Sequence, residues 1–134
     1  MGEELLKTLM ECLDRFGDLI GLALYILSRY PRSGPAILKT LALNPKPLYT
    51  RQLLDLAATS WGKAGRVRAD TEATLRFLEE QGLIRRWEEE CWIESKKKTG
   101  LKVKTKCKFN EITWKGRLVY SIIAKLEELG LIEI

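Results

Sequence analysis

The chain contains no histidine, and its 134 residues include only four side-chain amides: Asn44, Gln52, Gln81 and Asn110. Histidine is the commonest general base in enzymes, and no serine–lysine, cysteine or paired-carboxylate arrangement stands out to replace it. A phosphate-cradling glycine loop is also missing, since the GKAG segment at 62–65 is too short for one. We therefore expect no enzymatic activity and no cofactor, and three scattered cysteines supply no zinc site.

Long apolar runs are missing as well. The most apolar stretch, residues 19–27, is far shorter than the roughly 20 residues that a membrane-spanning helix needs. The segment before it is acidic, so it is not a signal peptide. Lysine, arginine and glutamate are abundant while amides are scarce, a bias typical of proteins from hot environments. We therefore expect an intracellular protein without a membrane partner, located in the cytoplasm (the host cytoplasm if it is viral), from a thermophile or its virus.

Positive charge is concentrated in one segment of the chain. The formal net charge is +5, but residues 96–115 alone carry +7, whereas residues 76–95 carry −3 and residues 1–30 carry −2. A basic protrusion on a near-neutral or acidic body favours a polyanionic partner. The alternative is an edge hairpin that uses lysine to block aggregation. In either case the segment is expected to lie on the surface.

This basic segment has the period of a β-strand. From Leu101 to Phe109 every odd position is apolar or small and every even position is lysine, which predicts one buried and one wet face. The segment 83–95 follows the same parity, so the numbers of paired residues must sum to an even number. A three-residue loop at 98–100, with Gly100 in the left-handed conformation, meets this condition and pairs Lys97 with Leu101. It also predicts three cross-strand pairs: Glu94 with Lys104, Glu90 with Lys108, and Cys91 with Cys107.

Two of the three cysteines fall on this predicted hairpin. Directly opposed residues have a Cα separation compatible with a disulfide, so Cys91 and Cys107 are candidates for one. Intracellular proteins of hyperthermophiles do contain disulfides, whereas reduced thiols are the rule in other cytosols. The alternative, two reduced and buried thiols, is the one we rank first. Cys12 is left over and is expected to pack as a helix residue.

The remaining elements follow from apolar periodicity and from residues that begin or end helices. Residues 1–30 carry apolar side chains at three- and four-residue steps, which predicts one long helix, or two helices broken near Gly17. The elements expected after it are a short helix with Pro35 as its first residue, a strand at Leu48–Tyr49, a helix capped by Thr50, a helix capped by Asp70 and ended by Gly82, the hairpin, a helix from Trp114, and a short strand at 131–134. The first helix is apolar on so much of its circumference that it must pack on its own domain or, as we prefer, on a second copy of the chain.

Two stretches resemble parts of a known family. LEEQGLIRR (78–86), followed by a charged hairpin, is similar to the end of the recognition helix and the wing of winged helix–turn–helix regulators. ITWKGR (112–117) is similar to their step into a C-terminal helix. The long connection from 50 to 78 most resembles the PadR group, with MarR-type regulators next. The segment 67–72 departs from the usual start of the PadR recognition helix, and the N-terminal helix is additional.

The resemblance implies an α+β, mainly α, fold with a β-hairpin wing. Residues 1–30 would form a helical segment for dimerisation or packing, and residues 31–134 a winged-helix domain with a C-terminal helix. The implied function is that of a transcription regulator that binds double-stranded DNA sequence-specifically as a homodimer. Its recognition helix would enter the major groove, and its lysine-rich wing would lie on the backbone or in the minor groove.

The resemblance also implies which residues contact DNA. They are Thr71, Glu72, Thr74 and Arg76 on the recognition helix, Arg66 and Arg68 before them, Arg51 and Gln52 at the start of the preceding helix, and Lys96, Lys97, Lys98, Lys102 and Lys104 in the wing. The rival interpretation is a winged helix that contacts protein, such as a subunit of transcription or replication machinery. The sequence identifies neither an operator nor a small-molecule effector.

Overall fold

The computed structural model describes residues 2–61, 67–94 and 100–132. Within these residues the fold is α+β and mainly helical, with a three-stranded antiparallel sheet, which confirms the expected class at this level. The elements in chain order are α1 (Gly2–Arg29), α2 (Ser33–Leu43), β1 (Leu48–Tyr49), α3 (Thr50–Trp61), α4 (Val67–Glu80), β2 (Ile84–Glu94), β3 (Lys102–Ile112) and α5 (Trp114–Glu128).

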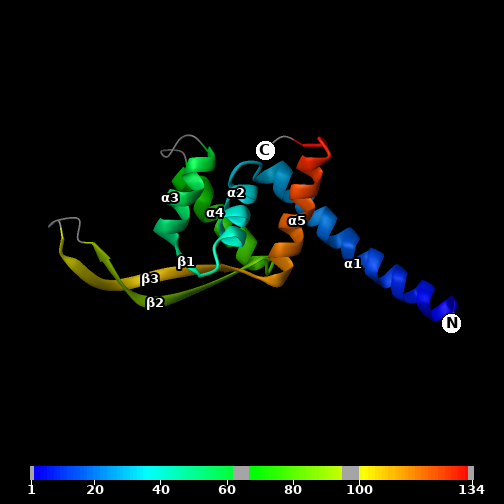
Figure 1. Cartoon of the computed structure of the whole chain (residues 1–134), viewed down its shortest axis with the longest axis horizontal. Coiled ribbons are helices and arrows are strands. Elements are labelled where there is room, and N and C mark those ends of the chain that lie inside the picture. The colour runs from blue at the N-terminus through cyan, green and yellow to red at the C-terminus, as the bar shows by residue number, and fades with distance from the viewer. Residues whose placement is uncertain (1, 62–66, 95–99, 133–134) are drawn as a thin grey trace.

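The strand order in the sheet is β1-β3-β2, so the short strand β1 pairs with the base of β3. Figure 1 shows the helices on one side of this sheet, while β2 and β3 continue past them as a long two-stranded hairpin. Helix α1 extends from the body in the opposite direction, with its N-terminal half clear of the other elements (Figure 1). The molecule is therefore a helical body with two projections.

The core lies where the helices meet each other and the base of the hairpin. Apolar residues at helical spacing fill it, as expected, because each helix turns one stripe inward. The buried side chains include Ala23 and Ile26 of α1, Ile37, Leu38 and Leu41 of α2, Leu53 of α3, Leu75 and Leu78 of α4, and Val119 and Ile123 of α5. Among the side chains of α1 that the structure describes, those that contribute to this core lie between Leu19 and Leu27.

The hairpin has the predicted parity but not the predicted register. Glu94 pairs with Lys102, Glu90 with Lys106 and Glu88 with Lys108, so paired numbers sum to two less than expected. Cys91 lies opposite Thr105 rather than opposite Cys107. Gly100 does adopt the left-handed conformation, with φ 86°, but most of the proposed three-residue loop and the Lys97–Leu101 pair fall outside the described residues. Any even shift preserves the apolar face, which is why parity alone did not determine the register.

The buried face of the hairpin changes along its length. Cys107 on the odd face is buried, as predicted, and Phe109 is half-buried. At the base, however, the even positions Ile84, Asn110 and Ile112 are buried, and Ile84 pairs with Ile112 beneath the helices. The prediction that the odd face is the buried one throughout is therefore wrong, because the helices cover the even face where the strands enter the body.

Three predicted helix starts are displaced. Helix α2 begins at Ser33, so Pro35 is its third residue, and α4 begins at Val67, so Asp70 lies inside the helix rather than at its cap. Thr50 is the first residue of α3, and its hydroxyl donates to the carbonyl oxygen of Lys108 at 3.3 Å instead of capping the helix. The cap is formed by Gln52, whose Oε1 accepts from the backbone N–H of Tyr49 at 3.3 Å, which is half of a capping box.

Other boundaries agree with the sequence. Helix α1 is continuous through Gly17, Gly82 ends α4 with φ 73°, and α5 begins at Trp114 with Thr113 as its cap. Thr113 Oγ1 accepts from the backbone N–H of Gly116 at 3.0 Å. The strand expected at 131–134 is not found in the part of it that the structure describes, residues 131–132.

Gly116 occupies the closest approach between α5 and the start of the hairpin. A Cβ at this position would overlap the carbonyl oxygen of Leu83 and would lie 2.8 Å from Cγ1 of Ile112. The same Leu83 oxygen accepts from the backbone N–H of Thr113 at 3.0 Å, so it is fixed in place. Only glycine fits at this contact, although glycine is a poor helix former.

We predict that Gly116→Ala lowers the free energy of unfolding by about 1–3 kcal/mol, because the clash outweighs the gain in helix propensity. Chemical denaturation followed by circular dichroism measures this. Gly21→Ala is the matched control, since a Cβ there meets nothing within 4 Å, and it should stabilise by up to about 1 kcal/mol. Equal effects of the two substitutions would contradict the role of close packing at Gly116.

Candidate nucleic-acid interface

Helix α4, the expected recognition helix, presents a different face from the predicted one. Thr71 and Thr74 are 1% and 0% exposed, so neither can contact a partner from the surface. Thr74 Oγ1 is 2.6 Å from Ser33 Oγ of α2, and this hydrogen bond lets both hydroxyls be buried. The assignment of Thr71 and Thr74 as DNA contacts is therefore wrong. Glu72 and Arg76, the other two predicted residues, are exposed.

The exposed surface of α4 between 71 and 80 is acidic. Arg76 is the one cation in this range, against Glu72, Glu79 and Glu80, and all four side chains are exposed. In helix–turn–helix proteins the N-terminal residues of the recognition helix reach the bases, so Glu79 and Glu80 lie at the end that such a contact does not need. Two arginines, Arg66 and Arg68, lie near the N-terminal end of α4 in the sequence. Arg66 is outside the described residues, and so is the side chain of Arg68.

The lysines of β3 are largely compensated by glutamates of β2. Lys102, Lys106 and Lys108 each lie opposite a glutamate, and Lys104 reaches diagonally to Glu90, with Nζ 2.9 Å from Oε2. The four lysines and the partners Glu88 and Glu90 are exposed, so each of these pairs contributes little to stability. The pairs nevertheless cancel much of the positive potential along the strands. Lys96, Lys97 and Lys98, which have no such pairing by sequence, fall outside the described residues.

A second basic site surrounds the first turn of α3. Arg51 and Gln52 are both exposed there, as predicted, although Gln52 is partly occupied in capping the helix. Sequence reasoning missed Arg86, whose Nε donates to Oδ1 of Asn110 at 2.8 Å and whose Nη2 is 3.5 Å from Thr50 Oγ1. The alternation of β2 places Arg86 on the same face as the lysines of β3, and this pattern could have identified Arg86 as part of a basic surface.

The outer face of the sheet, which the helices do not cover, carries an aromatic and sulfur cluster. Trp87 stacks on Phe109 with ring centroids 6.0 Å apart, and Tyr49 meets Phe109 edge-on at 6.2 Å. Next to them the structure joins Cys91 and Cys107 in a disulfide, with Cα atoms 5.9 Å apart. The two cysteines are diagonal rather than directly opposed, and the disulfide replaces the preferred expectation of two free thiols.

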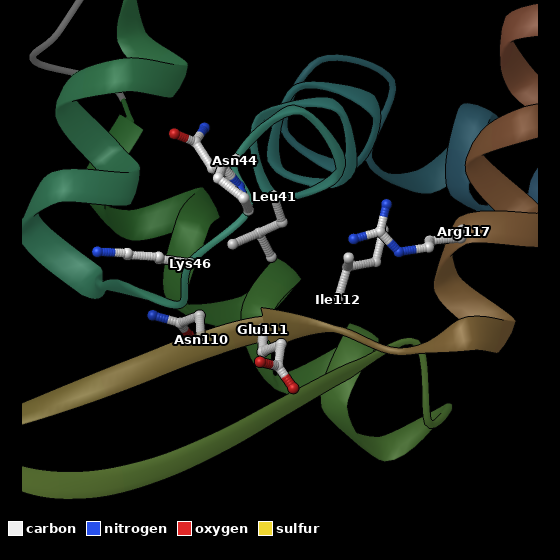
Figure 2. Close-up of a pocket in the computed structure, with 8 residues that line it drawn as sticks. Leu41, Asn44, Lys46, Asn110, Glu111, Ile112 and Arg117 are labelled. Carbon is white, nitrogen blue, oxygen red and sulfur yellow. The ribbon is translucent and has the colours of Figure 1, made fainter.

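A shallow pocket of about 230 Å³ lies between the end of α2, the connection to β1, the edge of β3 and the start of α5. Figure 2 shows Leu41 and Ile112 at its apolar side, with Lys46 and Arg117 at opposite rims and Glu111 directed away from the helices. Arg117 is already engaged, since Nη1 donates to the carbonyl oxygen of Ala42 at 3.3 Å. The volume is below the usual range for small-molecule sites, about 300–1,000 Å³.

No cluster of three or more potential metal-ligating side chains occurs among residues 2–61, 67–94 and 100–132. None of the helices in these ranges combines the length and the hydropathy that crossing a membrane requires.

Comparison with known proteins gives no match of any kind: no family model, curated protein or solved structure resembles this chain closely enough to be matched to it.

The disulfide gives a direct prediction. Protein purified without reductant and then denatured should show one free thiol per chain, from Cys12, by alkylation and mass spectrometry, and three after reduction. Reduction should lower the free energy of unfolding by about 3 kcal/mol, because it releases a loop of roughly 15 residues in the unfolded chain. Cys12→Ala should leave both the disulfide and this difference unchanged, whereas three free thiols before reduction would contradict the disulfide.

Proposed function

We propose that residues 31–134 form a winged helix–turn–helix domain that binds double-stranded DNA as a sequence-specific transcription regulator. The observation that carries this proposal is the arrangement of α2, β1, α3, α4, β2 and β3 around a sheet of order β1-β3-β2. In this arrangement α3 and α4 are the helix–turn–helix pair, and the projecting hairpin is the wing. Fold alone does not determine function, so the charged surface must carry the rest of the proposal.

The distribution of uncompensated cations supports a nucleic-acid partner. Phosphate contacts position a protein on DNA and are supplied by lysine, arginine and helix N-termini. Arg51 in the first turn of α3 provides one contact, and the lysines at 96–98 provide a second group by sequence. The N-terminal end of α4, with Arg68, would then reach the bases while Glu79 and Glu80 point away from the duplex.

We also propose that this regulator is a homodimer, and the surface of helix α1 supports this. Large apolar side chains remain exposed along it: Leu5, Leu6, Met10, Phe16, Ile20 and Leu24. By helical spacing they occupy one half of the circumference, and the charged residues Glu3, Glu4, Lys7, Asp14 and Asp18 occupy the other. The acidic side disfavours an anionic membrane surface, where such helices carry lysine and arginine. A second α1 would cover the apolar side without burying these charges.

The DNA proposal is tested by fluorescence anisotropy with labelled duplexes across a salt series. We expect the logarithm of the association constant to fall with a slope of several units per logarithm of salt concentration. Lys97→Ala combined with Lys98→Ala should weaken all duplexes alike and reduce the slope by about 2, since each phosphate contact contributes about 0.9. No binding at low salt would contradict the proposal.

Arg76→Ala serves as the contrasting variant. Because Arg76 is the exposed cation on the described part of α4, its loss should weaken one preferred sequence selectively and leave the salt slope on other duplexes nearly unchanged. An equal loss on every sequence would show that Arg76 contacts the backbone or nothing at all.

The dimer is tested by size-exclusion chromatography with light scattering. We expect the wild-type chain to have twice its mass of 15.4 kDa, and Phe16→Glu to shift it to the monomer because it places a charge in the apolar interface. Asp18→Ala, on the charged side of the same helix, should remain dimeric. A monomeric wild type would exclude α1 as a self-association surface.

A second candidate is a winged helix that contacts an acidic or mixed-charge protein. The observation that favours it is the near-neutral surface of the described hairpin, where β2 glutamates lie opposite β3 lysines, together with the acidic exposed face of α4. Such alternating charges suit a complementary protein surface as well as a polyanion. The salt series separates the two candidates, since only the DNA-binding proposal predicts that duplex binding weakens steeply as the salt concentration rises.

A further inference from the structure

Two adjacent arginines at the base of β2 have opposite environments. Arg85 lies on the outer face, where Nη2 is 2.8 Å from Oε1 of Glu111 and the guanidinium lies over the ring of Trp87, 5.2 Å from its centroid. Arg86 lies on the other face and is half-buried. Its contacts are to neutral oxygens, on Asn110 and Thr50, and within the described chain it has no carboxylate partner. The charge of Arg85 is neutralised, and that of Arg86 is not.

The side chain of Asn110 fixes the position of Arg86. Asn110 is 0% exposed, and its Nδ2 is 3.1 Å from the carbonyl oxygen of Leu48, 3.2 Å from Thr50 Oγ1 and 3.4 Å from the carbonyl oxygen of Lys108. Because two of these neighbours can only accept, the amide must present its nitrogen to them and its oxygen to Arg86. Rotation of the amide would set oxygen against oxygen in a buried site, which is costly.

This arrangement uses few of the donors of Arg86. A guanidinium has five N–H donors, of which Nε is bonded to Asn110 at 2.8 Å and Nη2 makes one long contact with Thr50 at 3.5 Å. The terminal nitrogens therefore retain donors that no other group in the described chain accepts from. A half-buried cation with its orientation fixed and its outer donors unused is preorganised for an anion, and paired donors of this kind match phosphate oxygens.

The surroundings of Arg86 are positively charged, which disfavours a guanidinium without a bound anion. Thr50 is the first residue of α3, so Arg86 lies beside the end of a helix that carries partial positive charge. Arg51 is exposed on the same turn and adds a further cation. A bound anion would offset this repulsion.

We infer that Arg86 is a phosphate contact of the DNA interface and that Asn110 is its positioning residue. The inference rests on the proposed function and deepens it, since it names a contact at the junction of α3 and the hairpin that is separate from the lysines at 96–98. It also assigns a function to a buried asparagine in a chain that has only two asparagines.

The test compares Arg86→Gln with Arg85→Gln in the duplex-binding salt series. Both remove one charge from neighbouring positions of the same strand. Arg86→Gln should weaken binding roughly tenfold on all sequences, the effect of losing one charge-assisted hydrogen bond. It should also reduce the salt slope by about 0.9. Arg85→Gln should change neither quantity, and Arg86→Lys should retain the slope while losing part of the affinity, because lysine keeps the charge but not the paired donors.

A double-mutant cycle tests the positioning role. Asn110→Ser should weaken duplex binding in the same direction as Arg86→Gln, and the double variant should bind no more weakly than Arg86→Gln alone. Additive losses would overturn the role of Asn110, and thermal melts verify that each variant is folded. If Asn110→Ser does not fold, the comparison of Arg86→Gln with Arg85→Gln still decides whether Arg86 is the phosphate contact.

The outcomes separate this inference from the function on which it rests. If the wild-type protein binds duplex DNA and Arg86→Gln matches Arg85→Gln, the phosphate contact is overturned while the proposed function stands. If the wild type does not bind at low salt, both are overturned.

Discussion

The helices cover only the base of the hairpin. The part of β2 and β3 beyond that base therefore faces solvent on both sides. A two-stranded ribbon is at best marginally stable in water, so the part of β2 and β3 that leaves the body needs stabilisation of its own. On the outer face this comes from the stacking of Trp87 on Phe109 and from the disulfide between Cys91 and Cys107. On the other face the strands present lysine–glutamate pairs to solvent.

The register error shows what the sequence did and did not determine. The period-2 pattern predicted both strands and their shared parity, but it permits any even shift. The predicted register follows from a three-residue loop, and it also places Cys91 opposite Cys107. The charges favoured the observed register instead, since it places Glu88 opposite Lys108, whereas the predicted one would have placed it opposite Asn110. The observed register also pairs Ile84 with Ile112, and both are buried under the helices. This tertiary contact stabilises the observed register, and no local sequence pattern indicates it.

The faces of α4 were misassigned for a similar reason. The predicted cap is Asp70, whereas the helix begins at Val67, and the predicted solvent face includes Thr71 and Thr74, which are buried. Thr71, Thr74, Leu75 and Leu78 in fact follow the i, i+3, i+4, i+7 spacing of a buried stripe. The sequence could not show that Ser33, forty-one positions away, satisfies the hydroxyl of Thr74. By contrast, Gly82 was predicted correctly as the end of this helix, because its role depends on the local backbone conformation alone.

The net charge of +5 is therefore a poor guide to where a polyanion would bind. Along the described hairpin, glutamates of β2 offset the charge of the β3 lysines, which are four of the eight lysines in residues 96–115. At the base of β2, the alternation of a strand separates two neighbouring arginines that look equivalent in the sequence. Arg85 meets a carboxylate, while Arg86 meets the amide that β3 places beneath α3. The orientation of this amide depends on the third strand, because β1 and the residue after it bring the carbonyl oxygen of Leu48 and the hydroxyl of Thr50 to the same asparagine. The binding potential of this chain thus depends on how its strands pair, and the number of its lysines is secondary.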